Sequence, residues 1–284
     1  MKSISELQDI ASQVRRDIIR MTALAQSGHP GGSLGCADFL TALYFNVMNI
    51  NPNRFKMDGE GEDVFFLSIG HISPVFYSVL AHRGYFPNAE LATFRKIGTR
   101  LQGHPSITHD LPGVRMASGS LGQGLSNAIG AALTKKLNGD NSLVYCLCGD
   151  GELQEGQNWE ALMFASAKGV DNLIAVVDHN GLQIDGDTQE VCDLGDLRAK
   201  FEAFGWQVLD LDGHDLKAIL FSTMDEAKKR LLNKKPVFIV MKTEMGHGVD
   251  FMTDNHKFHG APTNAEQTEA ALSQLKETLG DFPA

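Results

Sequence analysis

Two short polar segments, each directly after an apolar run, carry side chains that could bind a metal ion. Asp150 lies between two glycines after residues 143–148, and Asn180 begins an Asn-Gly-Leu sequence after residues 173–178. Short, continuous runs rich in β-branched residues are typical of strands buried on both faces of a parallel sheet. Residues 156–168 predict a crossover helix between them, which would bring both polar segments to one edge of the sheet.

Asp150 and Asn180 offer the hard oxygen ligands that Mg²⁺ prefers. The ion takes six oxygens in a near-ideal octahedron and completes its shell with phosphate groups and water, so a carboxylate, an amide and a main-chain carbonyl suffice. Asp-Gly and Asn-Gly are also ordinary turn dipeptides, and either one alone is more often structural. Their joint position after two buried strands favours a magnesium site that binds a diphosphate.

A glycine-rich segment, Gly-Ser-Leu-Gly-Gln-Gly at residues 119–124, opens a helical run at residues 125–133. Free N–H groups at a helix start attract anions, so we expect a diphosphate to bind there without an arginine. The alternative is close packing of small residues against a neighbouring helix. The glycine order differs from the dinucleotide fingerprint, which disfavours a nicotinamide enzyme.

Four histidines recur in short motifs along the chain. These are His29 in Ser-Gly-His-Pro-Gly, His71 in Leu-Ser-Ile-Gly-His, His104 in Gln-Gly-His-Pro, and His259 near the end. Each motif alone is more often a turn than a catalytic site. Around one cleft, however, several imidazoles can hydrogen-bond a polyhydroxylated substrate and move its protons near neutral pH.

The order of these motifs resembles one known family. Residues 149–156 and 177–185 are similar to the thiamine diphosphate fingerprint, and nearly the whole chain resembles the amino-terminal, diphosphate-binding domain of transketolases. The resemblance implies an α/β thiamine diphosphate-binding fold, with a mostly parallel sheet covered by helices on both faces. It also implies thiamine diphosphate and Mg²⁺ as cofactors.

The resemblance assigns roles position by position. It implies Asp150, Asn180 and the carbonyl of Leu182 as metal ligands. It implies that four histidines face the sugar donor and manage its protons: His29, His71, His104 and His259. The implied cofactor contacts are His71, Gly119, Ser120, Leu121, Gly151, Glu155, Asn180 and His259, with Glu155 on the aminopyrimidine side.

The resemblance also implies a partner. Single-chain transketolases continue into a pyrimidine-binding domain and a third domain, and the glutamate that protonates the aminopyrimidine lies in that part. We therefore expect the N-terminal subunit of a split transketolase, active only with a separate pyrimidine-domain subunit, in an assembly with at least two copies of each chain. Truncation of a longer protein is the alternative.

The implied reaction moves a two-carbon ketol unit from a ketose phosphate to an aldose phosphate, as in the pentose phosphate pathway. The sequence does not identify the two sugars. Two other functions remain open. The α-subunit of another thiamine diphosphate enzyme would share the magnesium motif, although it has no reason to carry the four histidines. A non-catalytic protein could bind thiamine diphosphate with half a site.

Composition limits the partners. The 284 residues are 43% hydrophobic, and the formal charge of −10 disfavours nucleic acid and an anionic membrane. The amino terminus lacks the apolar segment of a signal peptide, and no run of about 18 apolar residues occurs, so we expect a cytoplasmic protein. The cysteines form no Cys-x-x-Cys motif, and Cys146 and Cys148 are expected to point to one face of a buried strand.

We expect one thiamine diphosphate-binding domain over residues 1–284. Its first 60 residues or so are predicted to be helical, with helices over 4–25 and 36–45. Further strands are predicted at 64–67, 206–210 and 236–242, helices at 197–204, 216–232 and about 263–279, and loops at 98–118 and 181–195.

Overall fold

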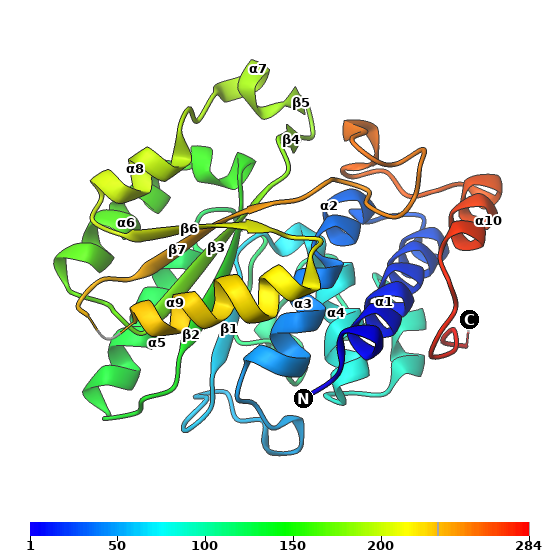
Figure 1. The fold of residues 1–284 in the computed structure, drawn as a ribbon. Helices are drawn as coiled ribbons and strands as arrows, with labels where there is room; N and C mark the ends of the chain where they lie inside the picture. Colours follow the sequence, from blue (N-terminus) through cyan, green and yellow to red (C-terminus); the bar gives the residue numbers. More distant parts are fainter. Residues whose placement is uncertain (232, 284) are drawn as a thin grey trace.

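A computed structural model describes residues 1–231 and 233–283. Its centre is a sheet of five parallel strands in the order β1-β2-β3-β7-β6 (Figure 1). The strands are β1 (Val64–Leu67), β2 (Val144–Gly149), β3 (Leu173–His179), β6 (Gln207–Asp212) and β7 (Val237–Lys242). Gly149 lies opposite Asp178 in the β2–β3 register, so these two strands end side by side.

Alternate residues of each strand enter two separate apolar cores. Phe65 and Leu67 of β1 join one core, whereas Val64 and Phe66 join the other. This alternation follows from the two-residue period of a strand. Both faces of the sheet are therefore buried and covered by helices, which confirms the fold class predicted from the sequence.

The first core lies under the amino-terminal helices. These are α1 (Ile4–Ala25), α2 (Pro30–Gly35), α3 (Ala37–Ala42) and α4 (Ser73–Arg83), and α9 (Asp225–Arg230) covers the same face. Helix α1 starts with a capping box, in which Ser3 and Glu6 bond to each other's backbone N–H groups. Pro30 begins α2, and His29 immediately precedes it at the N-cap position.

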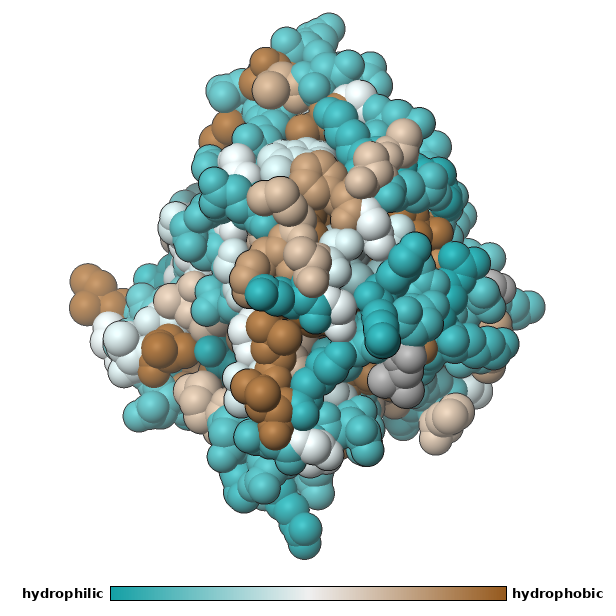
Figure 2. Space-filling view, turned by 90° about the vertical axis from the view of Figure 1, so that its left-hand side faces the viewer, coloured by the Kyte–Doolittle hydropathy of each residue, from teal (hydrophilic) through white to brown (hydrophobic). Residues whose placement is uncertain are grey.

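The second core lies under α5 (Gly124–Leu137), α6 (Gly156–Ala167) and α8 (Leu197–Ala203). Cys146 and Cys148 both belong to this core, as expected, and all four cysteines carry free thiols. Figure 2 views the molecule from the left-hand side of Figure 1 and shows apolar residues gathered in a band between polar surfaces. Leu137 of α5 and Met163 and Phe164 of α6 are exposed large apolar residues of these helices.

The carboxyl-terminal helix is shorter than predicted. Helix α10 spans Ala265–Gln274 rather than residues 263–279. The Arg16 side chain donates hydrogen bonds to the carbonyls of Leu272 and Leu275, at 2.9 and 2.6 Å, and pairs with Asp281 at 2.8 Å. These contacts cap the helix and hold the following segment in a non-helical path along α1.

Two other predictions differ in detail. The helix predicted at 216–232 is a π-helical segment over Ala218–Met224 followed by α9. Leu232 lies outside the described residues. The predicted loop 181–195 contains a small hairpin of β4 (Leu182–Gln183) and β5 (Gly186–Asp187), then α7 (Thr188–Cys192). Within the described residues, no helix combines the length and apolar character needed to cross a membrane.

Candidate functional site

A cavity of about 280 Å³ lies at the carboxyl-terminal edge of the sheet, where β1, β2, β3 and β7 end. This edge is where open α/β sheets bind ligands. The residues that line it come from segments spread over the whole chain: His29, Gly32, Ile69, His71, His104, Gly119, Leu121, Gly149, Asp150, Gly151, Glu152, Asp178, Asn180, Leu182, Gln183, Ile184, Met245 and His259. The cavity thus joins the two polar segments and all four histidines singled out in the sequence.

Asp150 ties the ends of β2 and β3 together. Its two carboxylate oxygens accept hydrogen bonds from the N–H groups of Gly151 and Gly181, each at 2.7 Å. Asn180 and Leu182 line the same cavity. Carboxylate, amide and main-chain carbonyl oxygens form a donor set that fits Mg²⁺.

Asp178 orients the amide of Asn180, a role that the sequence did not suggest. Its carboxylate accepts a hydrogen bond from the Asn180 amide nitrogen at 2.8 Å and another from the Thr243 hydroxyl. Burial, together with the charge of Asp150, raises the pKa of Asp178 to about 6. Because the amide nitrogen is engaged in this way, the ligand atom of Asn180 would be its amide oxygen, which also accepts a hydrogen bond from the Leu182 N–H at 2.9 Å and keeps a second lone pair.

Glu152 is a buried carboxylate beneath the glycine-rich segment. It accepts hydrogen bonds from the N–H groups of Gly122 at 2.7 Å and Gly149 at 3.0 Å, and from the Ser68 hydroxyl. Burial raises its pKa. Glu152 therefore connects β1, β2 and the start of α5.

These contacts revise the anion site predicted at the start of α5. The Gly122 N–H donates to Glu152, and the Gly124 N–H donates to the Ser68 hydroxyl at 3.1 Å, so neither N–H is available to a bound diphosphate. A Cβ atom on Gly124 would overlap the Ser68 side chain. Gly124 is therefore closely packed, although against Ser68 after β1 rather than against a neighbouring helix, while Gly119 and Leu121 line the cavity.

Four loops bring the histidines together. His71 lies in the short helical turn Gly70–Ile72, His104 lies in the loop before α5, and His259 follows the turn His256–Phe258. The ring of His29 lies 5.1 Å from His71, 6.1 Å from His104 and 5.6 Å from His259, measured between centroids. The His71 and His259 rings are 4.9 Å apart. We call these four residues the cavity histidines.

The cavity histidines favour the neutral imidazole. Burial, with smaller contributions from neighbouring histidines and Arg95, lowers the pKa of His29 to about 4. Burial also lowers the pKa of His71, His104 and His259. Among the described residues, Nδ1 of His29 and Nδ1 of His259 are buried without a hydrogen-bond partner. Neutral imidazoles with free nitrogens can accept a hydrogen bond or a proton from a ligand.

Two residues predicted to contact the cofactor do not line the cavity. Ser120 and Glu155 are exposed, although their neighbours Gly119, Leu121 and Gly151 are lining residues. Glu155 stands at the N-cap position of α6 and faces solvent. In this structure the two side chains stand at the rim of the site.

Comparison with known proteins places this geometry in a family. Residues 7–283 match the family described as "Transketolase, thiamine diphosphate binding domain". A 6-deoxy-6-sulfo-D-fructose transketolase subunit from Clostridium sp. (strain MSTE9) is 39% identical over 96% of this chain and 97% of its own length. An apulose-4-phosphate transketolase subunit from Phocaeicola vulgatus is 36% identical over 93% of this chain and 92% of its own length.

Solved structures agree with this relationship. The crystal structure of transketolase from Campylobacter jejuni matches 99% of this chain with a TM-score of 0.88 and 33% identity. The match spans 44% of that protein's chain. This chain therefore corresponds to under half of that transketolase and to nearly all of the two subunits. The sequence, the sheet and the cavity at its carboxyl-terminal edge all agree with this relationship. The chain belongs to the transketolase family and corresponds to the thiamine diphosphate-binding domain of that family.

Proposed function

We propose that this chain is the diphosphate-binding subunit of a two-chain transketolase, which transfers a two-carbon ketol unit from a ketose phosphate to an aldose phosphate. The observation that carries the proposal is the joint presence of four neutral histidines and the oxygen donors of Asp150, Asn180 and Leu182 in one cavity. A magnesium site alone would fit many thiamine diphosphate proteins. The cavity histidines add groups suited to a sugar substrate.

The metal and diphosphate would be held at the ends of β2 and β3. In this proposal Asp150, Asn180 and the carbonyl of Leu182 hold Mg²⁺, and Gly119, Leu121 and Gly151 border the diphosphate. A Cβ at Gly151 would lie 3.4 Å from Cβ of Gln183, an ordinary contact distance. Thiamine diphosphate, when bound, supplies the electron sink for cleavage of a carbon–carbon bond beside a carbonyl.

The cavity histidines would handle the protons of the sugar. Nδ1 of His29 and Nδ1 of His259 are buried and have no protein partner among the described residues. In the proposal they accept hydrogen bonds from substrate hydroxyls. One of them would accept the hydroxyl proton when the adjoining carbon–carbon bond breaks and that hydroxyl becomes the carbonyl of the released aldose. His71, which lies beside both of these rings, and His104 complete the polar wall of the cavity.

A second chain would complete the site. The two relatives that match this chain along nearly their whole length are both named as transketolase subunits. Helix α6 carries two exposed apolar residues, Met163 and Phe164, which offer contact area to a partner. We propose a 2+2 assembly with a separate pyrimidine-domain subunit. One domain over residues 1–284 and a cytoplasmic location remain predictions.

The relatives differ in the sugars that their names give. One is named for 6-deoxy-6-sulfo-D-fructose and the other for apulose 4-phosphate. For this chain the proposal therefore specifies ketol transfer between anionic sugars. It does not specify a pentose phosphate pathway substrate.

The test is to recover the tagged chain from its native cells with whatever co-purifies, and to assay ketol transfer with and without thiamine diphosphate and Mg²⁺. We expect a second chain in equal amount and activity that needs both cofactors. Asp150→Ala should abolish cofactor-dependent activity, while Asp187→Ala, at an exposed position on β5, should leave it unchanged. Cofactor binding without ketol transfer in the purified complex would instead support the non-catalytic alternative.

A further inference from the structure

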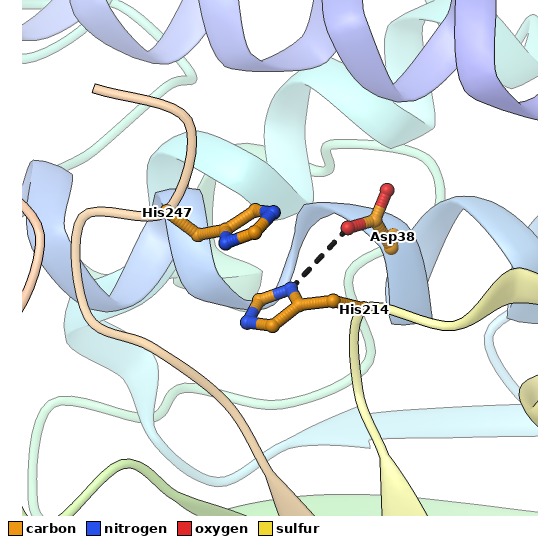
Figure 3. Close-up of side chains that lie close together, drawn as sticks. All are labelled: Asp38, His214 and His247. Carbon is orange, nitrogen blue, oxygen red and sulfur yellow. Dashed lines mark hydrogen bonds and ion pairs between the residues drawn. The ribbon is translucent and has the colours of Figure 1, made fainter. Parts of the chain in front are cut away.

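A second group of histidines lies at the same edge of the sheet, outside the cavity. His214 follows β6, and its Nδ1 lies 3.4 Å from Oδ2 of Asp38 on α3 (Figure 3). Its ring stacks on His247, with centroids 3.6 Å apart and planes 11° apart. Arg15 of α1 donates to both carboxylate oxygens of Asp38, at 3.2 and 2.5 Å.

This group reaches the segment that follows β7. The N–H of Glu244 donates to Nε2 of His214 at 2.9 Å, and the Glu244 carboxylate lies 2.8 Å from Nδ1 of His247. His214 therefore donates through Nδ1 to Asp38 and accepts through Nε2. We call Arg15, Asp38, His214, Glu244 and His247 the clamp, and residues 243–260 the β7 loop.

The β7 loop continues into the cavity. Met245 and His259, at its two ends, both line the cavity. The loop is seated on α2: the Gly246 N–H donates to the Gly31 carbonyl at 2.9 Å, and a Cβ on Gly31 would lie 2.7 Å from Cγ of Met245. The position of this loop therefore sets where two cavity residues stand.

The far end of the β7 loop is held by contacts within the loop and with α2. The Asp254 N–H donates to the Met245 carbonyl at 2.9 Å, which ties the middle of the loop back to its start. The Phe258 carbonyl would lie 2.9 Å from a Cβ on Gly31, so the segment before His259 packs on the same helix as Met245. A shift of the loop at Glu244 would therefore be felt at His259.

The donor atoms of Asp38, His214 and His247 lie within 4.8 Å of one another, a spacing that could also suit a metal ion. Two contacts argue against that use. Both ring nitrogens of His214 already have protein partners, and the Arg15 guanidinium pairs with Asp38. A cation would have to break the first and would lie beside the positive charge of the second. Hydrogen bonds and ion pairs within the clamp already engage Asp38, His214 and His247 without a metal ion.

We infer that the clamp positions the β7 loop, so that Asp38 and His214 act as positioning residues for Met245 and His259 in the cofactor cavity. The inference concerns a loop position, and its consequence for cofactor binding rests on the proposed function. His214 is the central member, because it contacts Asp38 of α3, the N–H of Glu244 and the His247 ring.

The test compares two histidine–carboxylate pairs in the full chain purified with its partner. His214→Ala removes the clamp contact. His82→Ala removes a buried pair with Asp17, 2.8 Å long, that joins α4 to α1 away from the cavity. We expect His214→Ala to speed amide hydrogen exchange in residues 244–260 selectively, and His82→Ala to speed exchange in α1 and α4 instead. His214→Gln, which keeps a donor and an acceptor, should restore part of the protection.

The kinetic arm tests the consequence for the cofactor. We expect His214→Ala to raise the KM for thiamine diphosphate about tenfold. We also expect kcat at saturating cofactor to fall, but by less than in a variant that removes a cavity histidine, because His259 would be displaced rather than lost. His82→Ala should change neither. Unchanged exchange in residues 244–260, or equal changes in both variants, would overturn the clamp. If the wild-type complex has no ketol transferase activity, the exchange experiment still decides the inference, and the proposed function alone fails.

Discussion

The cavity histidines and the clamp histidines lie at one edge of the same sheet, yet their surroundings are opposite. His29 and His259 each keep a buried nitrogen without a partner among the described residues. His214 and His247 contact the carboxylates of Asp38 and Glu244, at 3.4 and 2.8 Å. The first group is open to a ligand, whereas the second is engaged with the protein.

The difference shows how the fold assigns roles to one side-chain type. A buried imidazole without a carboxylate partner stays neutral and can take a proton from a substrate. An imidazole held between a carboxylate and a backbone N–H is fixed in one orientation, so it can hold a loop in place. The proximity of histidines alone does not distinguish these roles, but the partners of each nitrogen do.

The largest effect is expected from removing one of the cavity histidines. His71→Asn removes a ring that lies 5.1 Å from His29 and 4.9 Å from His259, so the complex should lose proton transfer at the sugar. We expect kcat to fall by about 10²- to 10⁴-fold. Steady-state assay of cofactor-dependent ketol transfer measures this, with thermal unfolding as a check on folding. His109→Ala, at an exposed position outside the cavity, is the control, and a wild-type kcat in His71→Asn would remove the cavity histidines from the mechanism.

A smaller effect is expected from two glutamates at the cavity, one buried and one exposed. Glu152→Gln replaces an acceptor of three hydrogen bonds with an amide whose NH₂ must face a donor, so the free energy of unfolding should fall by about 1–3 kcal/mol. Glu155→Gln changes an exposed carboxylate three residues later and should cost less than about 0.5 kcal/mol. Urea unfolding of both variants measures the difference. Equal losses would mean that Glu152 does not organise the site.

The same pair of glutamates shows how far sequence reasoning reaches. Asp150, Asn180 and His71 could be placed because each follows a strand, and parallel strands end at one edge. Glu152 could not, because its inward direction depends on the short turn Gly151–Gln154 and its partners come from Ser68 and Gly122 on other segments. A motif gives the spacing of residues along the chain, whereas these contacts are made across it.

The clamp escaped prediction for a similar reason. Arg15, Asp38, His214 and His247 lie far apart in sequence, and none belongs to a motif that resembles a site. The anion site at residues 119–124 was predicted too simply, since the helix start does supply free N–H groups but Glu152 and Ser68 accept two of them. Helix and strand positions were predicted well where the apolar period was clear, and α10 ended early because Arg16 caps it.

The smallest effect expected is a change in how stability depends on pH. His29 has a pKa of about 4 when folded and 6.5 as its ordinary value, so between these values the unfolded chain binds the extra proton and stability falls as pH falls. His29→Gln should remove up to one proton from this dependence, about 1.4 kcal/mol per pH unit. The raised pKa of Asp178, about 6, changes stability in the opposite direction. Its contribution is the same in the wild type and in His29→Gln, so it does not affect the difference between their slopes. Urea unfolding from pH 4 to 7 measures the two slopes, and identical slopes would show that His29 is not held neutral by burial.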